Sequence, residues 1–138
     1  MSKRWVVTLS LAAVLLFGIP ALARQAIGLN GEWQATYGDV KSAPPADATW
    51  SPVTVPSAFR WRPLGPHTLW YRRDLYLPPA WAGQRIILTI KGAKYSQRVL
   101  LNGAEVGQHL GGFESAEYDL TKQAMLGSAN ELLVAVQD

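Results

Sequence analysis

The sequence predicts an all-β protein, built as an antiparallel sandwich or barrel, and three observations support this fold class. All but Gly18 and Pro20 of the 12 glycines and 9 prolines fall after residue 23, mostly between apolar stretches. Turn signals of this kind recur about every ten residues, a spacing typical of short strands. Asn102-Gly103 stands between two apolar segments and predicts a hairpin, because both residues tolerate the positive φ of a tight turn.

The expected strands are justified in chain order by apolar or β-branched runs that end at turn residues. Pro56 closes one run and Pro78-Pro79 another, while the segment RIILTIK is β-branched enough for a buried strand. We expect loops over residues 41–48 and 60–68, a turn over 80–84 and one helical turn over 121–126. The expected strands are Glu32–Tyr37, Trp50–Val55, Leu69–Leu77, Arg85–Lys91, Ser96–Leu101, Ala104–Val106, Tyr118–Leu120 and Glu131–Gln137.

Composition narrows the class of protein further. A hydrophobic content of 49% with 17% charged residues excludes a disordered chain. The absence of cysteine excludes disulfides, thiol nucleophiles and cysteine zinc sites. With only His67 and His109 as histidines, a metal site would rest mostly on carboxylates, and we predict neither a metal nor a cofactor. All six tryptophans except Trp5 remain after residue 23, enough to fill a two-sheet core.

The N-terminus has the order of a secretory signal peptide. Lys3 and Arg4 precede the apolar run Trp5–Ile19, and Pro20 is followed by Ala21-Leu22-Ala23, an A-x-A cleavage site. We therefore expect cleavage after Ala23, a mature domain over residues 24–138, and a secreted or periplasmic protein. The competing interpretation is an uncleaved membrane anchor, because the run approaches the roughly 20 residues that span a bilayer.

Removal of the signal peptide would also lower the net charge of the protein. The formal net charge is +3, but without Lys3 and Arg4 there are 11 basic residues against 10 acidic ones, a net charge of +1. The basic pI therefore gives no support for nucleic acid as a partner.

No catalytic motif is present: the sequence has no G-x-S-x-G elbow, P-loop, G-x-G-x-x-G or H-E-x-x-H. Glycoside hydrolysis needs two carboxyl groups about 5–5.5 Å apart for retention, or roughly 6.5–9.5 Å for inversion. Any two acidic residues could meet across a sheet, but their spacing does not indicate a pair. They are Glu32, Asp39, Asp47, Asp74, Glu105, Glu114, Glu117, Asp119, Glu131 and Asp138.

The loop over residues 60–68 carries the best candidates for carbohydrate binding. Proteins hold sugars by stacking aromatic faces on C–H patches while planar polar groups bond the hydroxyls, and this loop offers Trp61 and His67. The competing interpretations are a core or interdomain plug for Trp61 and a local hydrogen-bonding role for His67. Arg72 and Arg73, adjacent in one strand, point to opposite faces. We expect them to be structural or interfacial. One of the two should face inward or toward a partner and then need a carboxylate, with Asp74, Glu114 and Asp119 as candidates.

An ordered set of segments resembles the N-terminal sugar-binding domain of glycoside hydrolase family 2, the β-galactosidase, β-glucuronidase and β-mannosidase group. The set spans residues 29–137, nearly all of the mature chain. Its most specific piece includes the Asn102-Gly103 hairpin. The matching segments are LNGEW (29–33), VTVP (53–56), LWYRR (69–73) with LYLP (75–78), VLLNGAEVGQH (99–109) with GGF (111–113), YDLT (118–121) and NELLVAV (130–136).

This resemblance implies a jelly-roll β-sandwich of the galactose-binding-domain type, carbohydrate as a partner and no cofactor. In the family, an immunoglobulin-like domain and a (β/α)₈ barrel with two catalytic glutamates follow, so whether this chain is an enzyme stays open. Asn130-Glu131 echoes the Asn-Glu pair of the family's acid/base, but its place before a V-A-V strand matches the sugar-binding domain. Ala116 departs from the family by its small size.

Three functions remain open: a non-catalytic N-terminal piece of a secreted family 2 glycosidase, a stand-alone carbohydrate-binding module, and an inert interdomain scaffold. The chain ends at Asp138, directly after an expected strand. A stand-alone module should complete its own sheets, whereas a fragment leaves an edge strand unpaired and prone to association, so this end favours the fragment interpretation.

Overall fold

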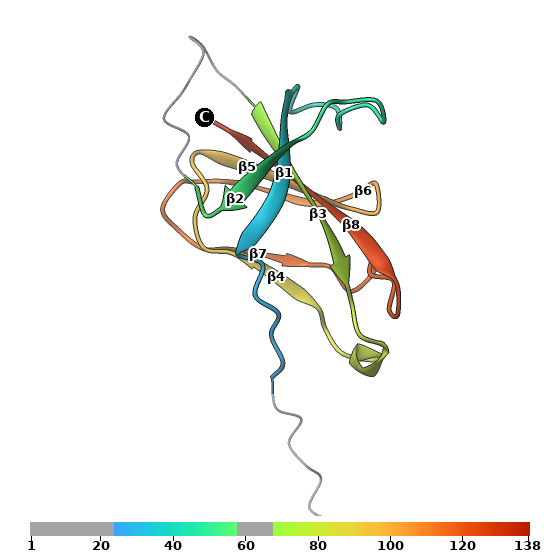
Figure 1. Ribbon diagram of the computed structural model, residues 1–138. Helices are drawn as coiled ribbons and strands as arrows, with labels where there is room; N and C mark the ends of the chain where they lie inside the picture. Colours follow the sequence, from blue (N-terminus) through green and yellow to red (C-terminus); the bar gives the residue numbers. More distant parts are fainter. Residues whose placement is uncertain (1–23, 58–67) are drawn as a thin grey trace, which may run out of the picture.

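The computed structural model describes residues 24–57 and 68–138 of the chain (Figure 1). The expected signal peptide and the candidate residues Trp61 and His67 lie outside the described residues. Within them the chain forms eight strands and one short 3-10 helix. They are β1 (Gly31–Gly38), β2 (Ser51–Val55), β3 (Thr68–Tyr76), η1 (Pro79–Trp81), β4 (Ile87–Ile90), β5 (Ser96–Leu101), β6 (Ala104–Leu110), β7 (Ala116–Asp119) and β8 (Ala129–Gln137).

The strands make two antiparallel sheets. The larger sheet has the order β2-β1-β3-β8-β5-β6, and β4 pairs with β7 in the smaller one. We call the face of the larger sheet that packs against β4 and β7 the inner face, and the opposite one the outer face. This arrangement confirms the all-β class and the antiparallel jelly-roll β-sandwich.

Hydrophobic side chains alternate between the two faces of the larger sheet, as the period of a strand requires. The inner core lies between the sheets, and a smaller cluster of Trp70, Leu100, Leu133 and Ala135 lies on the outer face. The buried residues of the inner core are Trp33, Leu75, Leu77, Ile86, Leu88, Val99, Leu101, Ala116, Tyr118, Leu120, Leu132 and Val134.

The segment between β1 and β2 folds over the outer cluster. The indole Nε1 of Trp70, which is fully buried, donates to the carbonyl of Asp39 at 3.0 Å. Arg98 donates from Nη1 to the carbonyl of Val40 at 2.7 Å and forms an ion pair with Glu105 at 2.7 Å. Val40 and Trp50 pack against the cluster, so this segment shields the outer apolar surface from water.

The predicted hairpin is confirmed between β5 and β6. Asn102 has φ 52° and Gly103 has φ 80°, the two positive angles of a type I′ turn. β6 continues well past Val106, where the sequence predicted its end. Gly107 permits this because its hydrogen faces the Tyr118 ring, and a Cβ there would lie 3.2 Å from Cδ1 of that ring.

The C-terminal strand corrects one expectation. The expected unpaired edge strand is not β8, which lies inside the larger sheet and pairs with β3 on one side and β5 on the other. The expected association through a free terminal strand therefore loses its basis.

The segment expected to make one helical turn, residues 121–126, forms hydrogen-bonded turns and no helix. One hydrogen bond of α-helical spacing is present, from the Ala124 amide to the Leu120 carbonyl at 2.9 Å. Asp119 caps the turn by accepting from the Thr121 amide at 3.0 Å. Ala116, the small residue that departs from the family pattern, is buried in the inner core.

No helix in residues 24–57 or 68–138 is both long and apolar enough to cross a membrane.

Candidate functional site

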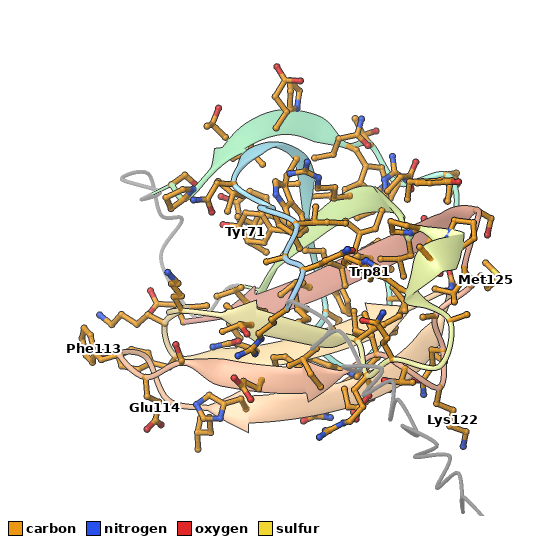
Figure 2. The ribbon with its side chains drawn as sticks, turned by 90° about the horizontal axis from the view of Figure 1, so that it is seen from below. Tyr71, Trp81, Phe113, Glu114, Lys122 and Met125 are labelled. Atoms are coloured by element: carbon orange, nitrogen blue, oxygen red, sulfur yellow. The ribbon has the colours of Figure 1, made fainter. Side chains whose placement is uncertain are left out.

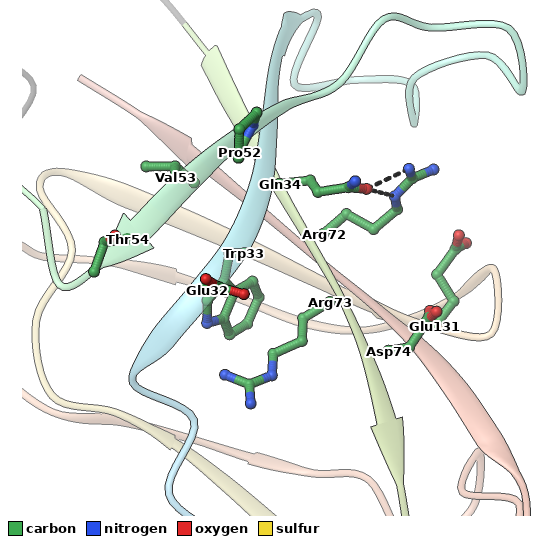
Figure 3. A pocket seen from close by; sticks show the side chains of 10 residues that line it. All are labelled: Glu32, Trp33, Gln34, Pro52, Val53, Thr54, Arg72, Arg73, Asp74 and Glu131. Carbon is green, nitrogen blue, oxygen red and sulfur yellow. Dashed lines mark hydrogen bonds between the residues drawn. The ribbon is translucent and has the colours of Figure 1, made fainter.

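A groove opens in the larger sheet where β1 and β3 stop pairing. Their register runs from Gly38 opposite Thr68 to Gln34 opposite Arg72. Beyond that point β1 pairs only with β2, and β3 pairs only with β8. The space between them is a groove of about 740 Å³ (Figure 3). Its lining residues are Glu32, Trp33, Gln34, Pro52, Val53, Thr54, Arg72, Arg73, Asp74 and Glu131.

Arg72 is fixed at the closed end of this groove. Its Nε and Nη2 donate to Oε1 of Gln34, at 3.1 Å and 2.5 Å. The guanidinium also lies over the Trp50 ring, 4.3 Å from the ring centroid, in a cation–π contact. Arg72 thus presents a planar, held guanidinium beside the Gln34 amide on the outer face (Figure 3).

Arg73 is held separately, next to Trp33. It donates from Nη1 to the carbonyl of Leu29 at 2.8 Å, and its guanidinium lies 5.8 Å from the Trp33 ring centroid. The indole Nε1 of Trp33 donates to the same carbonyl at 2.7 Å. Arg73 therefore ties the segment that precedes β1 to β3 across the groove.

The expected carboxylate partner of these arginines is wrong. Arg72 instead bonds the Gln34 amide oxygen and lies over the Trp50 ring, and Arg73 bonds the Leu29 carbonyl beside the Trp33 ring. Asp119 pairs with Arg85 at 3.0 Å, and Glu114 Oε1 lies 3.3 Å from Nε2 of His109. Asp74 projects into the groove without an ion pair to any described residue.

Three carboxylates surround the groove. Asp74 and Glu131 are direct partners on β3 and β8, and Glu32 lies on β1. All three are exposed, and none forms an ion pair within residues 24–57 and 68–138. Figure 3 shows Glu32 on one side and Asp74 with Glu131 on the other, with the Arg73 side chain between them.

The sequence did not reveal this set. Asp74 and Glu131 are far apart in the chain, and only the pairing of β3 with β8 brings them together. The alternation of inward and outward side chains along both strands places Asp74 and Glu131 on the same face. It could have predicted the pair only if the pairing of these two strands had been known. The loop candidates Trp61 and His67 are not tested by the described residues and stay predictions.

Asn130, next to Glu131, has a structural role. It is fully buried, and its Nδ2 donates to the carbonyls of Met125 at 2.8 Å, Ser128 at 3.1 Å and Leu75 at 3.3 Å. Its Oδ1 accepts from the Met125 amide at 2.7 Å and from Nδ2 of Asn102 at 2.9 Å. All its polar atoms are used in fixing the turn before β8.

Two carboxylates outside the groove, Glu105 and Asp119, have a lowered pKa. The pKa of Glu105 is lowered because the Gln108 amide and then the Arg98 guanidinium donate to it. The pKa of Asp119 is lowered chiefly by hydrogen bonds from Thr121, with a further contribution from Arg85. These groups stabilise the sheet edges and the turn after β7.

The groove has the chemistry to bind a polyhydroxylated ligand. Its carboxylate and amide oxygens accept hydrogen bonds from hydroxyl groups, and the guanidinium and the Thr54 hydroxyl donate them. Nothing in the described part of the chain forms a group of three or more His, Cys, Asp or Glu placed to hold a metal ion.

The comparisons define the class of protein to which this fold belongs. Residues 23–138 match the family described as "Glycosyl hydrolases family 2, sugar binding domain". The chain belongs to this family and is a sugar-binding domain of the type found at the N-terminus of family 2 glycosidases.

Individual relatives point the same way. The chain is 33% identical over 94 residues to a β-glucuronidase of Paenibacillus borealis, covering 68% of this chain and 15% of the relative. A solved β-glucuronidase of Faecalibacterium prausnitzii superposes with a TM-score of 0.67 at 30% identity, over 80% of this chain and 20% of that one. A β-glucuronidase of an uncultured Clostridium sp. gives a TM-score of 0.70 at 29% identity, over 88% and 24%. The chain thus spans less than a quarter of the length of these proteins.

Proposed function

We propose that the chain is the non-catalytic, carbohydrate-contacting domain of a β-glucuronidase-like glycosidase, and that the groove between β1 and β3 is its contact site. The observation that carries this proposal is the groove itself: about 740 Å³ lined by a held guanidinium, an amide, a hydroxyl and three carboxylates, on a family 2 sugar-binding sandwich. In ligand sites a few placed polar groups fix the orientation of the ligand, and a rigid scaffold holds them in position.

The parent activity in this proposal is hydrolysis of O-glycosyl bonds in carbohydrate metabolism. The relatives named above are β-glucuronidases, and each is several times longer than this chain. The family resemblance places the catalytic glutamates in a barrel domain, preceded by an immunoglobulin-like domain. Both domains would be partners of this sandwich within the parent enzyme.

The groove itself is a poor setting for catalysis. A glycosidase acid works in an apolar, enclosed pocket, as lysozyme illustrates. Asp74 and Glu131 are instead solvent-exposed on an open sheet. Their direct opposition on β3 and β8 fits binding of hydroxyl groups better than proton transfer.

A scaffold role is the second candidate, favoured by an exposed apolar turn. Leu110 is 81% exposed and Phe113 is 92% exposed, and Phe113 projects from the loop between β6 and β7 (Figure 2). Exposed apolar groups of this size often mark contacts with a neighbouring domain. Replacing Phe113 by Ser should leave sugar binding intact and weaken only the contact with the rest of the enzyme.

Export forms a separate part of the proposal. It rests on the charged, apolar and A-x-A order of residues 3–23. Expression in a bacterial host followed by N-terminal sequencing should give a mature start at Arg24. Recovery of the intact N-terminus in the membrane fraction would favour an anchor instead.

Calorimetric titration of the full chain tests the groove directly. With methyl β-D-glucoside as probe, Gln34→Ala should weaken binding about fivefold, the effect of one lost hydrogen bond of about 1 kcal/mol. Thr54→Ala should weaken it similarly, whereas Thr89→Ala is the matched control, because Thr89 is an exposed threonine on β4. If all three variants bind the glucoside as tightly as the unsubstituted chain, the groove is not the contact site.

A further inference from the structure

The groove carries an unbalanced charge. Glu32, Asp74 and Glu131 are exposed and have no ion partner among the described residues. Against them stand Arg72 and Arg73. Three carboxylates therefore face two guanidinium groups.

Both guanidinium groups are already engaged by the protein. Arg72 is bonded to Gln34 and lies over Trp50, and Arg73 is bonded to the carbonyl of Leu29 beside Trp33. Arg73 lies on the same face of the larger sheet as Trp33, a residue of the inner core. Its positive charge therefore lies toward the inner face. On the outer face Arg72 keeps its single positive charge, and the three carboxylates of Glu32, Asp74 and Glu131 outnumber it, so the field at the outer opening of the groove is net negative.

The carboxylates also lie on both walls. Asp74 and Glu131 are on β3 and β8, and Glu32 is on β1 (Figure 3). A ligand that binds between these walls has carboxylates of the protein on both sides. If the ligand is an anion, moving it away from the carboxylate on one wall brings it closer to those on the other. Hydroxyl groups of a ligand are attracted by the same carboxylates, because each carboxylate offers two strong acceptor oxygens to which they can donate.

We infer that the groove selects uncharged or amino sugars and rejects uronates, with Glu32, Asp74 and Glu131 as the specificity-determining residues. This inference rests on the proposed function of the groove. It means that the anionic sugar of a β-glucuronidase-like parent is not the ligand of this site. The groove instead holds an uncharged or amino-sugar part of a glycan.

Two matched sugars test the inference. Methyl β-D-glucoside and methyl β-D-glucuronide differ only at C6, where a hydroxymethyl group replaces a carboxylate. For the full chain in 20 mM salt we expect the glucoside to bind about tenfold more tightly, since each exposed charge pair contributes up to about fivefold. D-Glucosamine, which carries an ammonium group, should bind at least as tightly as the glucoside.

Two changes should remove the discrimination. In the triple variant Glu32→Gln, Asp74→Asn, Glu131→Gln the two sugars should bind within about twofold of each other, while Glu117→Gln, an exposed carboxylate on β7, should keep the gap. Raising the salt to 500 mM should also narrow it, because the screening length falls to a few ångströms. Circular dichroism of the variants confirms that each remains folded.

The outcomes separate this inference from the proposed function. Tighter binding of the glucuronide, or an unchanged gap in the triple variant, overturns the inference and leaves the groove as a sugar site. Binding of neither sugar nor glucosamine overturns the proposed site and the inference together.

Discussion

The carboxylates of Asp74 and Glu131 are direct cross-strand neighbours on β3 and β8, and neither has an ion partner within the described residues. Like charges placed directly opposite in an antiparallel pair destabilise a sheet. The protein therefore accepts a local cost in stability at the same place where the groove opens. A ligand whose hydroxyl groups bond both carboxylates would relieve that cost.

Asp74→Asn should therefore stabilise the fold. The expected gain is roughly 0.2–1 kcal/mol in the free energy of unfolding, the range of cross-strand pair effects. Urea denaturation at pH 7 measures it, and the gain should shrink at high salt because screening weakens the repulsion. Asp47→Asn, in the exposed segment between β1 and β2, is the matched control. A stability loss in Asp74→Asn alone would contradict the repulsion.

Asn130→Ala should be strongly destabilising. The substitution leaves the Met125 amide without its acceptor and three carbonyls without their donor, at a buried position. A loss of about 2–4 kcal/mol is expected, in line with broken buried hydrogen-bond networks. Thermal unfolding measures it against Asn30→Ala, whose side chain is exposed. A change as small as that of the control would show that the turn before β8 does not depend on this side chain.

Stability should fall on the acid side, with Glu105 as one cause. Its pKa in the folded protein is lowered by Gln108 and Arg98, whereas an unfolded glutamate titrates near about 4.3. The contribution is thus fully present above the unfolded pKa and is lost as the pH falls through the folded pKa. Asp119, whose pKa is also lowered, adds a loss of the same sign.

Glu105→Gln separates the two contributions. The difference in unfolding free energy between pH 7 and pH 3 should become smaller in this variant, while Glu117→Gln should change it little. An identical acid dependence in Glu105→Gln and the unsubstituted chain would show that the Gln108 and Arg98 contacts do not stabilise the folded state.

The chain should not hydrolyse glycosides. Nitrophenyl β-glucuronide and nitrophenyl β-galactoside are suitable substrates, and no release of nitrophenol above the buffer rate is expected. The reason is that the family's catalytic glutamates belong to a barrel domain, and the only facing carboxylates in this groove are exposed. Turnover that disappears in Glu131→Gln would place catalysis in the groove and contradict this account.

Local features of the fold could be predicted from the sequence. The Asn102-Gly103 turn needs only positive φ at two residues, and the proline and glycine punctuation placed most strands within a few residues. The interior position of β8 could not be predicted, because strand order depends on pairing between distant segments. The continuation of β6 through Gly107 also depends on a tertiary contact, the Tyr118 ring.

The groove could not be predicted from the sequence either, because it too depends on how distant strands pair. Arg72 and Arg73 were correctly placed on opposite faces, but their partners, Gln34 and the Leu29 carbonyl, are set by the register of β1 against β3. The aromatic signal directed attention to Trp61 and His67 in a loop. These two residues lie outside the described part of the chain and stay predictions. The described residues form a polar groove on strands, where Arg72 and Arg73 lie over indole rings.

Chemical-shift mapping of the ¹⁵N-labelled full chain during titration with methyl β-D-glucoside tests the central claim most directly. The account predicts that the largest shifts fall on the backbone amides of Glu32, Gln34, Thr54, Arg72 and Asp74, which line the groove. Shifts confined to the opposite layer, β4 and β7, or no shifts at saturating sugar, would contradict it.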